Sequence, residues 1–357
     1  MNRLCQSSYG NLEAVINVSG FRGDNRRKLI HFSRDRKTGQ WNTSAIISEN
    51  PISGGSIIEN LVKRHPDQIH GEFEVLVLES DGILKHYTRD NLVSQDDGVF
   101  VWRLSASVNV IEESKASPGV TPSYLTVTRD ASPLLQMPSN GGVSLETTVL
   151  ALGGDLIHYR CLLNTVGKNL LADRYQWKKA DVITSDAMGP ACLYKLESKP
   201  LTALVPVRNA INAYCLQGGK WTMSRTVLDS HGMVCTSYVP VPGIATMEVV
   251  FKTAGSVLRS FTMDGTTSKP TETLLPPALS HIRSSPCHRV RPSSPIAIAS
   301  QMKHGLGHSP NTEAVVFHAC GTGWQDTWMI LHWSLLSGTD EWVVSGVVLP
   351  HVTGMPL

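Results

Sequence analysis

The stretch FEVLVLESDGILKHYTRD (residues 73–90) decides the fold of this chain. Val, Ile, Thr, Phe and Tyr are frequent on both sides of Ser80-Asp81-Gly82, and residues of these types are typical of β-strands. Ser, Asp and Gly in succession favour a tight turn. The stretch therefore predicts a β-hairpin, with Glu74 on its first strand and His86-Tyr87 on its second.

Two flanking segments extend this hairpin to four strands. SIIENLV (residues 56–62) precedes it as an apolar run, and VFVWRLSASV (residues 99–108) follows it and contains Trp102. Together the segments predict one small antiparallel sheet with the order inner strand, hairpin, outer strand.

The Glu, His-aromatic and Trp landmarks of this sheet recur along the chain. The clearest copies carry Glu146, His158-Tyr159 and Trp177; Glu13, LIHF (residues 29–32) and Trp41; and Glu313, LHW (residues 331–333) and Trp342. A fourth unit keeps only Tyr214 and Trp221, and a fifth keeps Glu248 and Phe261. Self-similarity at such a period indicates an array of repeated sheets.

Six four-stranded antiparallel units predict an all-β fold, a six-bladed β-propeller, in which radial packing protects the sheet edges. The repeat runs from end to end, so we expect one domain over residues 1–357. The expected blades span residues 2–48, 54–109, 133–184, 190–228, 232–276 and 294–350. The third is placed by the likeness of PLLQ (residues 133–136) to RLCQ (residues 3–6).

The recurring residues are expected to be structural, because a catalytic group has no reason to appear in several blades. This applies to the repeated glutamates and to His31, His86, His158 and His332. Each Trp should cover the flank of a neighbouring blade, and each His-aromatic pair should fill the space between blades.

Composition excludes several classes of protein. The net charge of +2 forms no basic stripe, which argues against nucleic acid as a partner. No apolar stretch is long enough for a membrane helix. The seven cysteines show no metal-ligand spacing, so no metal or other cofactor is expected, and the odd number leaves at least one thiol free beside one or two disulfides.

The localisation remains open between two alternatives. No signal peptide precedes the first expected strand, so the protein is either secretory, with its leader absent from this chain, or cytoplasmic. Two sequons, at Asn17 and Asn42, would permit glycosylation of a secreted protein. The oligomeric state does not follow from the sequence.

No hydrolytic, phosphate-binding or dinucleotide-binding motif occurs in the chain. The first strands of the six units should converge on a central channel, and their polar residues differ from blade to blade, as one asymmetric site would require. These residues are Gln6, Glu59, Gln136, Tyr194, Thr236 and Gln301, with Lys63, Lys195, Tyr238 and Lys303 beside them. A water-filled channel lined by assorted polar side chains is the alternative.

The strand patterns (Leu/Phe)-Glu-x-Val and Leu-x-His-aromatic resemble those of a group of fungal and bacterial propellers, some of them related to lectins. Within that group, the size and the six units resemble the fungal hetero-Diels-Alderases of tropolonic sesquiterpenoid biosynthesis. This resemblance implies a cofactor-independent enzyme that joins a tropolone-derived ortho-quinone methide to a humulene-type alkene, both hydrophobic small molecules. No catalytic residue of that family can be matched to a position here.

A cycloaddition requires orientation of two partners rather than a nucleophile or a metal, which agrees with the missing motifs. Under this hypothesis Tyr194, Tyr238, Lys63 or Lys195 would donate a hydrogen bond to the quinone methide oxygen, and Glu59 would act as acid or base. A carbohydrate-binding lectin is the main alternative, and its ligand residues should repeat between blades. An interaction scaffold is a third, because fold alone does not choose.

Overall fold

The computed structural model describes most of the chain. The described residues are 4–19, 26–52, 55–60, 71–89, 101–110, 124–130, 144–151, 154–163, 175–189, 191–194, 200–229, 234–240, 246–252, 258–264, 271–274, 290–301, 311–320, 327–335 and 342–353.

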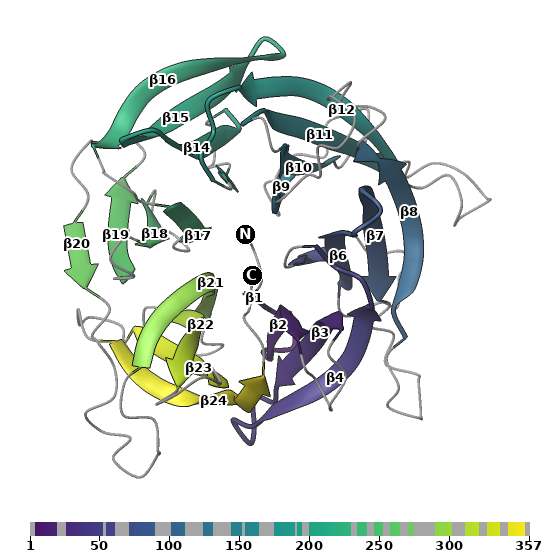
Figure 1. The fold of residues 1–357 in the computed structure, drawn as a ribbon, viewed down its shortest axis with the longest axis vertical. Helices are drawn as coiled ribbons and strands as arrows, with labels where there is room; N and C mark the ends of the chain where they lie inside the picture. The colour runs from purple at the N-terminus through teal and green to yellow at the C-terminus, as the bar shows by residue number, and fades with distance from the viewer. Residues whose placement is uncertain are drawn as a thin grey trace.

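The protein is a six-bladed β-propeller in which every blade is a four-stranded antiparallel sheet. The blades stand in a ring, with the first strand of each blade nearest the axis and the last at the periphery (Figure 1). Each blade is built from four strands that are consecutive in the chain, so no strand is shared between blades.

The strands of the first three blades are β1 (Leu4–Gln6), β2 (Leu12–Ser19), β3 (Arg27–Arg34), β4 (Trp41–Ser48), β5 (Ser56–Asn60), β6 (Glu72–Leu78), β7 (Ile83–Arg89), β8 (Arg103–Asn109), β9 (Tyr124–Asp130), β10 (Ser144–Leu150), β11 (Leu156–Leu163) and β12 (Tyr175–Thr184). The strands of the other three are β13 (Cys192–Tyr194), β14 (Thr202–Val207), β15 (Ala210–Gln217), β16 (Lys220–Asp229), β17 (Val234–Pro240), β18 (Thr246–Lys252), β19 (Leu258–Asp264), β20 (Thr271–Leu274), β21 (Val290–Gln301), β22 (Asn311–Cys320), β23 (Thr327–Leu335) and β24 (Trp342–Thr353).

The third blade corrects one sequence-based prediction. Its inner strand is β9, which pairs with β10 from Tyr124 to Asp130, so the blade begins earlier than residue 133. The likeness of PLLQ to RLCQ was therefore misleading. The run YLTVTRD carries the β-branched residues that suit a strand, but the Ser and Pro residues around it favoured an irregular segment.

A β-bulge recurs in the outer half of the blades. The pairing of the third and fourth strands shifts by one residue between His31 and Phe32, and at the matching point in the second, third, fourth and sixth blades. A bulge increases the local twist of a strand. In the first, second, third and sixth blades the bulge falls at the His-aromatic pair, so this pair marks the same structural position there; in the fourth it falls at Ala213-Tyr214.

Apolar side chains fill the space between neighbouring blades. One buried cluster joins the first and last blades, with Ile16 and Phe32 packed in the same core as Val315, Ile330 and Val348. Because no strand crosses from the last blade to the first, this core and the ring contact of Trp41 with His332 close the ring. Burial of about 25 cal/mol per Å² of apolar surface stabilises such boundaries.

Candidate functional site

The boundary between the third and fourth blades contains a chain of buried hydrogen bonds. His158 on β11 lies 2.6 Å from Glu146 on β10, measured from Nε2 to Oε2. Trp221 of the next blade donates its Nε1–H to His158 Nδ1 at 3.2 Å. The Glu and His landmarks of one blade are thus linked to the Trp landmark of the next.

The same arrangement occurs between the second and third blades. Trp177 donates to His86 Nδ1 at 3.4 Å, and His86 Nε2 lies 3.5 Å from Glu74 Oε2. Tyr175 donates to the other Glu74 oxygen at 3.2 Å. Between the last and first blades, the rings of His332 and Trp41 meet edge to face with centroids 5.6 Å apart.

The indole hydrogen bond fixes the protonation state of these histidines. Trp Nε1–H is a donor only, so the Nδ1 atom that it contacts must be an acceptor. His86 and His158 are therefore neutral imidazoles that carry their proton on Nε2, facing the glutamate. His158 is hydrogen-bonded through both nitrogens, whereas His86 is bonded to Trp177 through Nδ1 and its Nε2 makes no hydrogen bond among the described residues.

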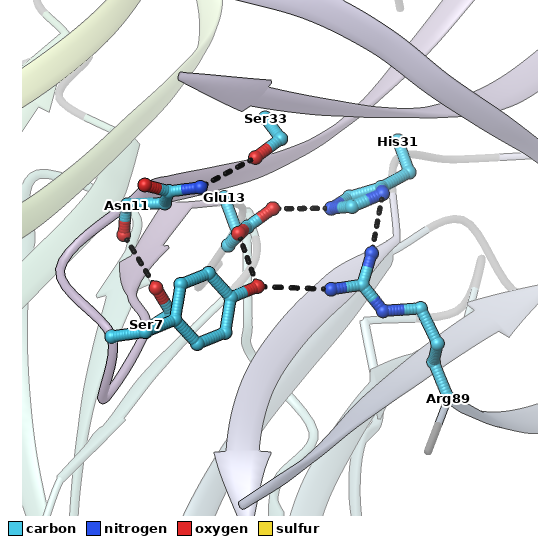
Figure 2. Close-up of polar contacts among 7 residues, drawn as sticks. Ser7, Asn11, Glu13, His31, Ser33 and Arg89 are labelled. Carbon is cyan, nitrogen blue, oxygen red and sulfur yellow. Dashed lines mark hydrogen bonds and ion pairs between the residues drawn. The ribbon is translucent and has the colours of Figure 1, made fainter. Parts of the chain in front are cut away.

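An arginine replaces the indole donor between the first and second blades. Figure 2 shows Glu13, His31 and Arg89 in contact. His31 Nε2 lies 2.8 Å from Glu13 Oε2, and Arg89 donates to His31 Nδ1 at 3.3 Å and to the Tyr9 hydroxyl at 3.1 Å. The Nε1 atom of Trp102, whose ring packs against His31, is buried and has no hydrogen-bond partner among the described residues.

Burial dominates the electrostatics of this boundary. It lowers the pKa of His31, an effect that the Arg89 charge reinforces and that Glu13 opposes. Burial together with the Glu13 charge raises the pKa of the Tyr9 hydroxyl. The Arg89 guanidinium lies 4.6 Å from the centre of the Phe73 ring, a cation–π distance.

The structure thus confirms that the recurring histidines pack between blades against Trp41, Trp102, Trp177 and Trp221. The side chain of Trp342 lies outside the described part. The histidines and these four tryptophans belong to the framework, and the contacts that hold them are made within the protein. A functional site is better sought among groups that this framework positions but does not consume.

Three of the residues predicted to line the channel have described side chains. Gln6 ends β1, and its amide donates to the Gly10 carbonyl at 3.4 Å. Glu59 accepts hydrogen bonds from the Ser8 backbone and hydroxyl at 2.6 and 2.7 Å, which ties the first turn to the second blade. Burial raises the pKa of the Glu59 carboxyl, against the effect of these donors.

Tyr194 ends β13 and is 7% exposed. Burial raises the pKa of its hydroxyl to about 12, so the group is a neutral donor at physiological pH. It lies opposite Thr202 in the strand pairing. A protonated phenol of this kind is what the predicted donor role requires.

For the other predicted channel residues the structure describes at most the backbone. Gln301 ends β21, Tyr238 lies within β17, and Thr236 occupies a bulge in β17 rather than a strand end; their side chains are outside the described part. Lys63, Gln136, Lys195 and Lys303 lie outside the described residues altogether.

Arg160 was not predicted as a site residue. It lies two residues after His158 on β11, and its Nε donates to the second oxygen of Glu146 at 2.7 Å. Its side chain is 39% exposed, whereas that of Glu146 is fully buried. The sequence contained one signal for this residue. At the position after the His-aromatic pair the third blade has Arg160, whereas the first, second and sixth blades have Ser33, Thr88 and Ser334.

Two further predictions concern cysteines and sequons. Cys5, Cys161, Cys192 and Cys215 are free thiols, and the side chains of the other three cysteines are outside the described part. Asn17 is 3% exposed and Asn42 is exposed on β4, so only Asn42 presents a sequon at the surface.

Within the described residues, no helix has the length and hydropathy to cross a membrane. No three His, Cys, Asp or Glu side chains in that part of the chain are grouped to hold a metal ion.

Comparison with solved structures places the chain among fungal lectins in fold. The six-bladed, fucose-binding lectin of Aleuria aurantia superposes with a TM-score of 0.59 at 14% identity, covering 97% of this chain and 94% of the lectin. AofleA from Arthrobotrys oligospora gives 0.53 at 10% identity, covering 96% and 86%. The SapL1 lectin gives 0.55 at 11%, covering 98% and 95%.

No protein-family model matches the chain, and no curated protein matches it either. The fold that the structure and these comparisons define is the six-bladed β-propeller.

Proposed function

We propose that this chain is a carbohydrate-binding propeller without catalytic activity. The observation that carries the proposal is the partly exposed Arg160, which the buried Glu146 holds at one blade boundary. Sugars present hydroxyl groups that pair with charged donors and acceptors, and C–H faces that pack on apolar side chains. The structurally similar lectins support this class of ligand, since the Aleuria aurantia lectin recognises fucose and SapL1 forms a complex with α-methyl fucoside.

A glycan array followed by calorimetric titration tests the proposal. We expect saturable binding of at least one glycan to the full chain, with a stoichiometry below the number of blades because the boundaries differ in sequence. Binding should be lost when the protein is unfolded. If no glycan on a broad array binds at millimolar concentration, the proposal is wrong.

The second candidate is a hetero-Diels-Alderase that binds a quinone methide and a humulene-type alkene in the central channel. Two observations favour it: His86 and His158 are hydrogen-bonded within the protein, and burial keeps the Tyr194 hydroxyl protonated. A donor on the quinone methide oxygen would lower the energy of the acceptor orbital. The cycloaddition forms one C–C and one C–O bond and releases nothing.

This candidate is tested by adding the protein to a quinone methide, generated in place from its precursor, with the alkene present. Enzymatic acceleration and a stereochemical ratio different from that without protein would support it. Tyr194→Phe should then reduce the rate at unchanged thermal stability. A rate and a ratio equal to those in buffer would exclude the reaction.

A further inference from the structure

The boundary between the third and fourth blades holds a partly exposed arginine whose terminal nitrogens contact none of the described residues. Arg160 contacts Glu146 through Nε, and no other partner of its guanidinium lies within the described residues. An arginine is a planar fork with five N–H donors, of which this contact takes one.

The guanidinium is held in place by buried groups. Trp221 donates to His158, His158 donates to Glu146, and Glu146 accepts from Arg160. Both oxygens of the fully buried carboxylate are therefore engaged, which restricts rotation of the arginine. Binding of a ligand to an arginine that is already held in place costs less side-chain entropy than binding to a freely rotating cation.

A second cation faces the same way. Lys178 on β12 lies directly opposite Arg160 in the strand pairing, so the two side chains are on one face of the sheet. Lys178 is exposed. Lys178 therefore places a second exposed cation beside Arg160 on this face.

The neighbouring blade contributes apolar surface to this boundary. Met223 is two residues after Trp221 on β16, on the same strand face, and is 53% exposed. Its side chain therefore points toward the third blade, as that of Trp221 does. The exposed thioether of Met223 offers an adaptable apolar surface to a ligand at this boundary.

No other described blade reproduces this arrangement. The position of Arg160 is occupied by Thr88 in the second blade and by Ser334 in the sixth, and each pairs with a bulge serine, Ser105 and Ser345 respectively. In the third blade the bulge residue is Ala180, which offers no hydroxyl. The exchange of a hydroxyl pair for an arginine beside an alanine distinguishes this boundary from the others.

We infer that Arg160 and Lys178 form a subsite for the carboxylate of an acidic sugar. This inference rests on the proposed carbohydrate-binding function and specifies its ligand class. A carboxylate accepts two parallel hydrogen bonds from an arginine fork, a geometry that a neutral hydroxyl cannot match in strength. The exposed lysine adds attraction for the anion.

The test compares D-galacturonate with D-galactose, which differ in the carboxylate at C6, by calorimetric titration of the full chain. Galacturonate should bind about tenfold more tightly or better, because hydrogen bonds to charged groups are stronger than neutral ones. Raising the salt concentration should weaken galacturonate binding and leave galactose binding unchanged, since salt screens exposed charges.

Three variants localise the effect. Arg160→Gln should remove about tenfold or more of the galacturonate affinity, and Lys178→Gln should remove a smaller factor. Lys179→Gln is the matched control, because this neighbouring lysine is also exposed but faces the other side of the strand. If Arg160→Gln folds poorly, the proposal is still tested by comparing the galacturonate affinities of Lys178→Gln and Lys179→Gln.

Equal affinity for the two sugars, or equal effects of the two lysine substitutions, would overturn the acidic-sugar subsite while the carbohydrate-binding function stands. Absence of binding by every glycan on the array would overturn the function itself, and the subsite with it.

Discussion

At the scale of single residues, the indole N–H groups distinguish otherwise similar boundaries. Trp221 donates to His158, whereas the Trp102 Nε1 atom is buried without a hydrogen-bond partner among the described residues. Both side chains pack against a histidine of the preceding blade. The two tryptophans thus form a matched pair that differs in one hydrogen bond.

Trp221→Phe should lower the free energy of unfolding by more than Trp102→Phe does, by about 1 kcal/mol or somewhat more. Both changes remove similar apolar area, but only the first leaves a buried His Nδ1 without its donor. Denaturant unfolding of the two variants measures the difference. Equal losses would show that the hydrogen bond adds nothing to the packing.

His31 should make the protein less stable in mild acid. Its pKa is lowered in the folded state, so the unfolded chain takes up the proton first as the pH falls. Its contribution is complete above the ordinary histidine pKa of about 6.5 and is lost as the pH falls from there toward the folded-state pKa. The groups that face it are Glu13, Arg89, Phe73 and Trp102.

The measurement is the urea midpoint at several pH values between about 7.5 and 5, for the wild type and for His31→Gln. A group of this kind can contribute up to about 1.4 kcal/mol per pH unit. The pH dependence should be smaller in the variant, which cannot be protonated at this position. Parallel curves for the two proteins would assign the acid sensitivity to other groups.

At the scale of elements, two glycine turns show what the hairpins require. Gly219, between β15 and β16, has a φ of +81°, and a Cβ there would meet nothing within 4 Å. Gly154, between β10 and β11, has a φ of +91°, and a Cβ would lie 2.7 Å from the Ser185 carbonyl oxygen. Gly219 is required only for the left-handed backbone conformation, whereas Gly154 is also required because no Cβ fits beside the Ser185 carbonyl.

Gly219→Ala should therefore cost about 1 kcal/mol, from conformational strain alone. Gly154→Ala should cost that amount and a further 1–3 kcal/mol or so for the steric conflict with a backbone atom. Chemical denaturation of both variants gives the comparison. A smaller effect at Gly154 would mean that the segment near Ser185 moves without cost.

Some strands and turns could be predicted from the sequence alone, and others could not. The hairpin of residues 73–90, the Trp landmarks and the six units were predictable because strand residues, turn residues and repeats are local signals. The inner strand β9 was not, because YLTVTRD is short and lies among Ser and Pro residues. Likeness to another blade then placed the strand about ten residues too late.

Contacts between blades were harder to predict than the blades themselves. Trp221 and His158 are 63 residues apart, and Arg89 and Tyr9 are 80 apart. No local pattern specifies such pairs, since they depend on how neighbouring sheets stack. The sequence indicated that His, Glu and Trp are structural, but it did not indicate that Arg160 is held by their network.

At the scale of the whole molecule, the ring closes through side chains. The first blade is β1–β4 and the last is β21–β24, so neither borrows a strand from the other. The joint between them is the apolar cluster around Phe32 and Ile330, with the contact of Trp41 and His332. It shares its Trp–His ring contact with the three other joints whose side chains the structure describes, but the Trp41 Nε1 atom has no hydrogen-bond partner among the described residues.

A circular permutant that begins at β5 and joins β24 to β1 through a flexible linker should fold with nearly unchanged thermal stability. The new chain ends fall between β4 and β5, so both blades beside the cut stay complete. The linker joins β24 of the last blade to β1 of the first, which are neighbours in the ring. A permutant cut between β2 and β3, inside the first sheet, is the control and should be markedly less stable. Similar melting temperatures for the two would contradict this account of the ring.

The contact of each tryptophan with a histidine of the preceding blade has an optical consequence. Indole emission responds to the hydration and protonation of an adjacent imidazole, and the rings of Trp41, Trp102, Trp177 and Trp221 each touch one such imidazole. Each of these four boundaries therefore contains its own fluorophore. Single-tryptophan versions of the protein would report, joint by joint, the order in which the ring opens.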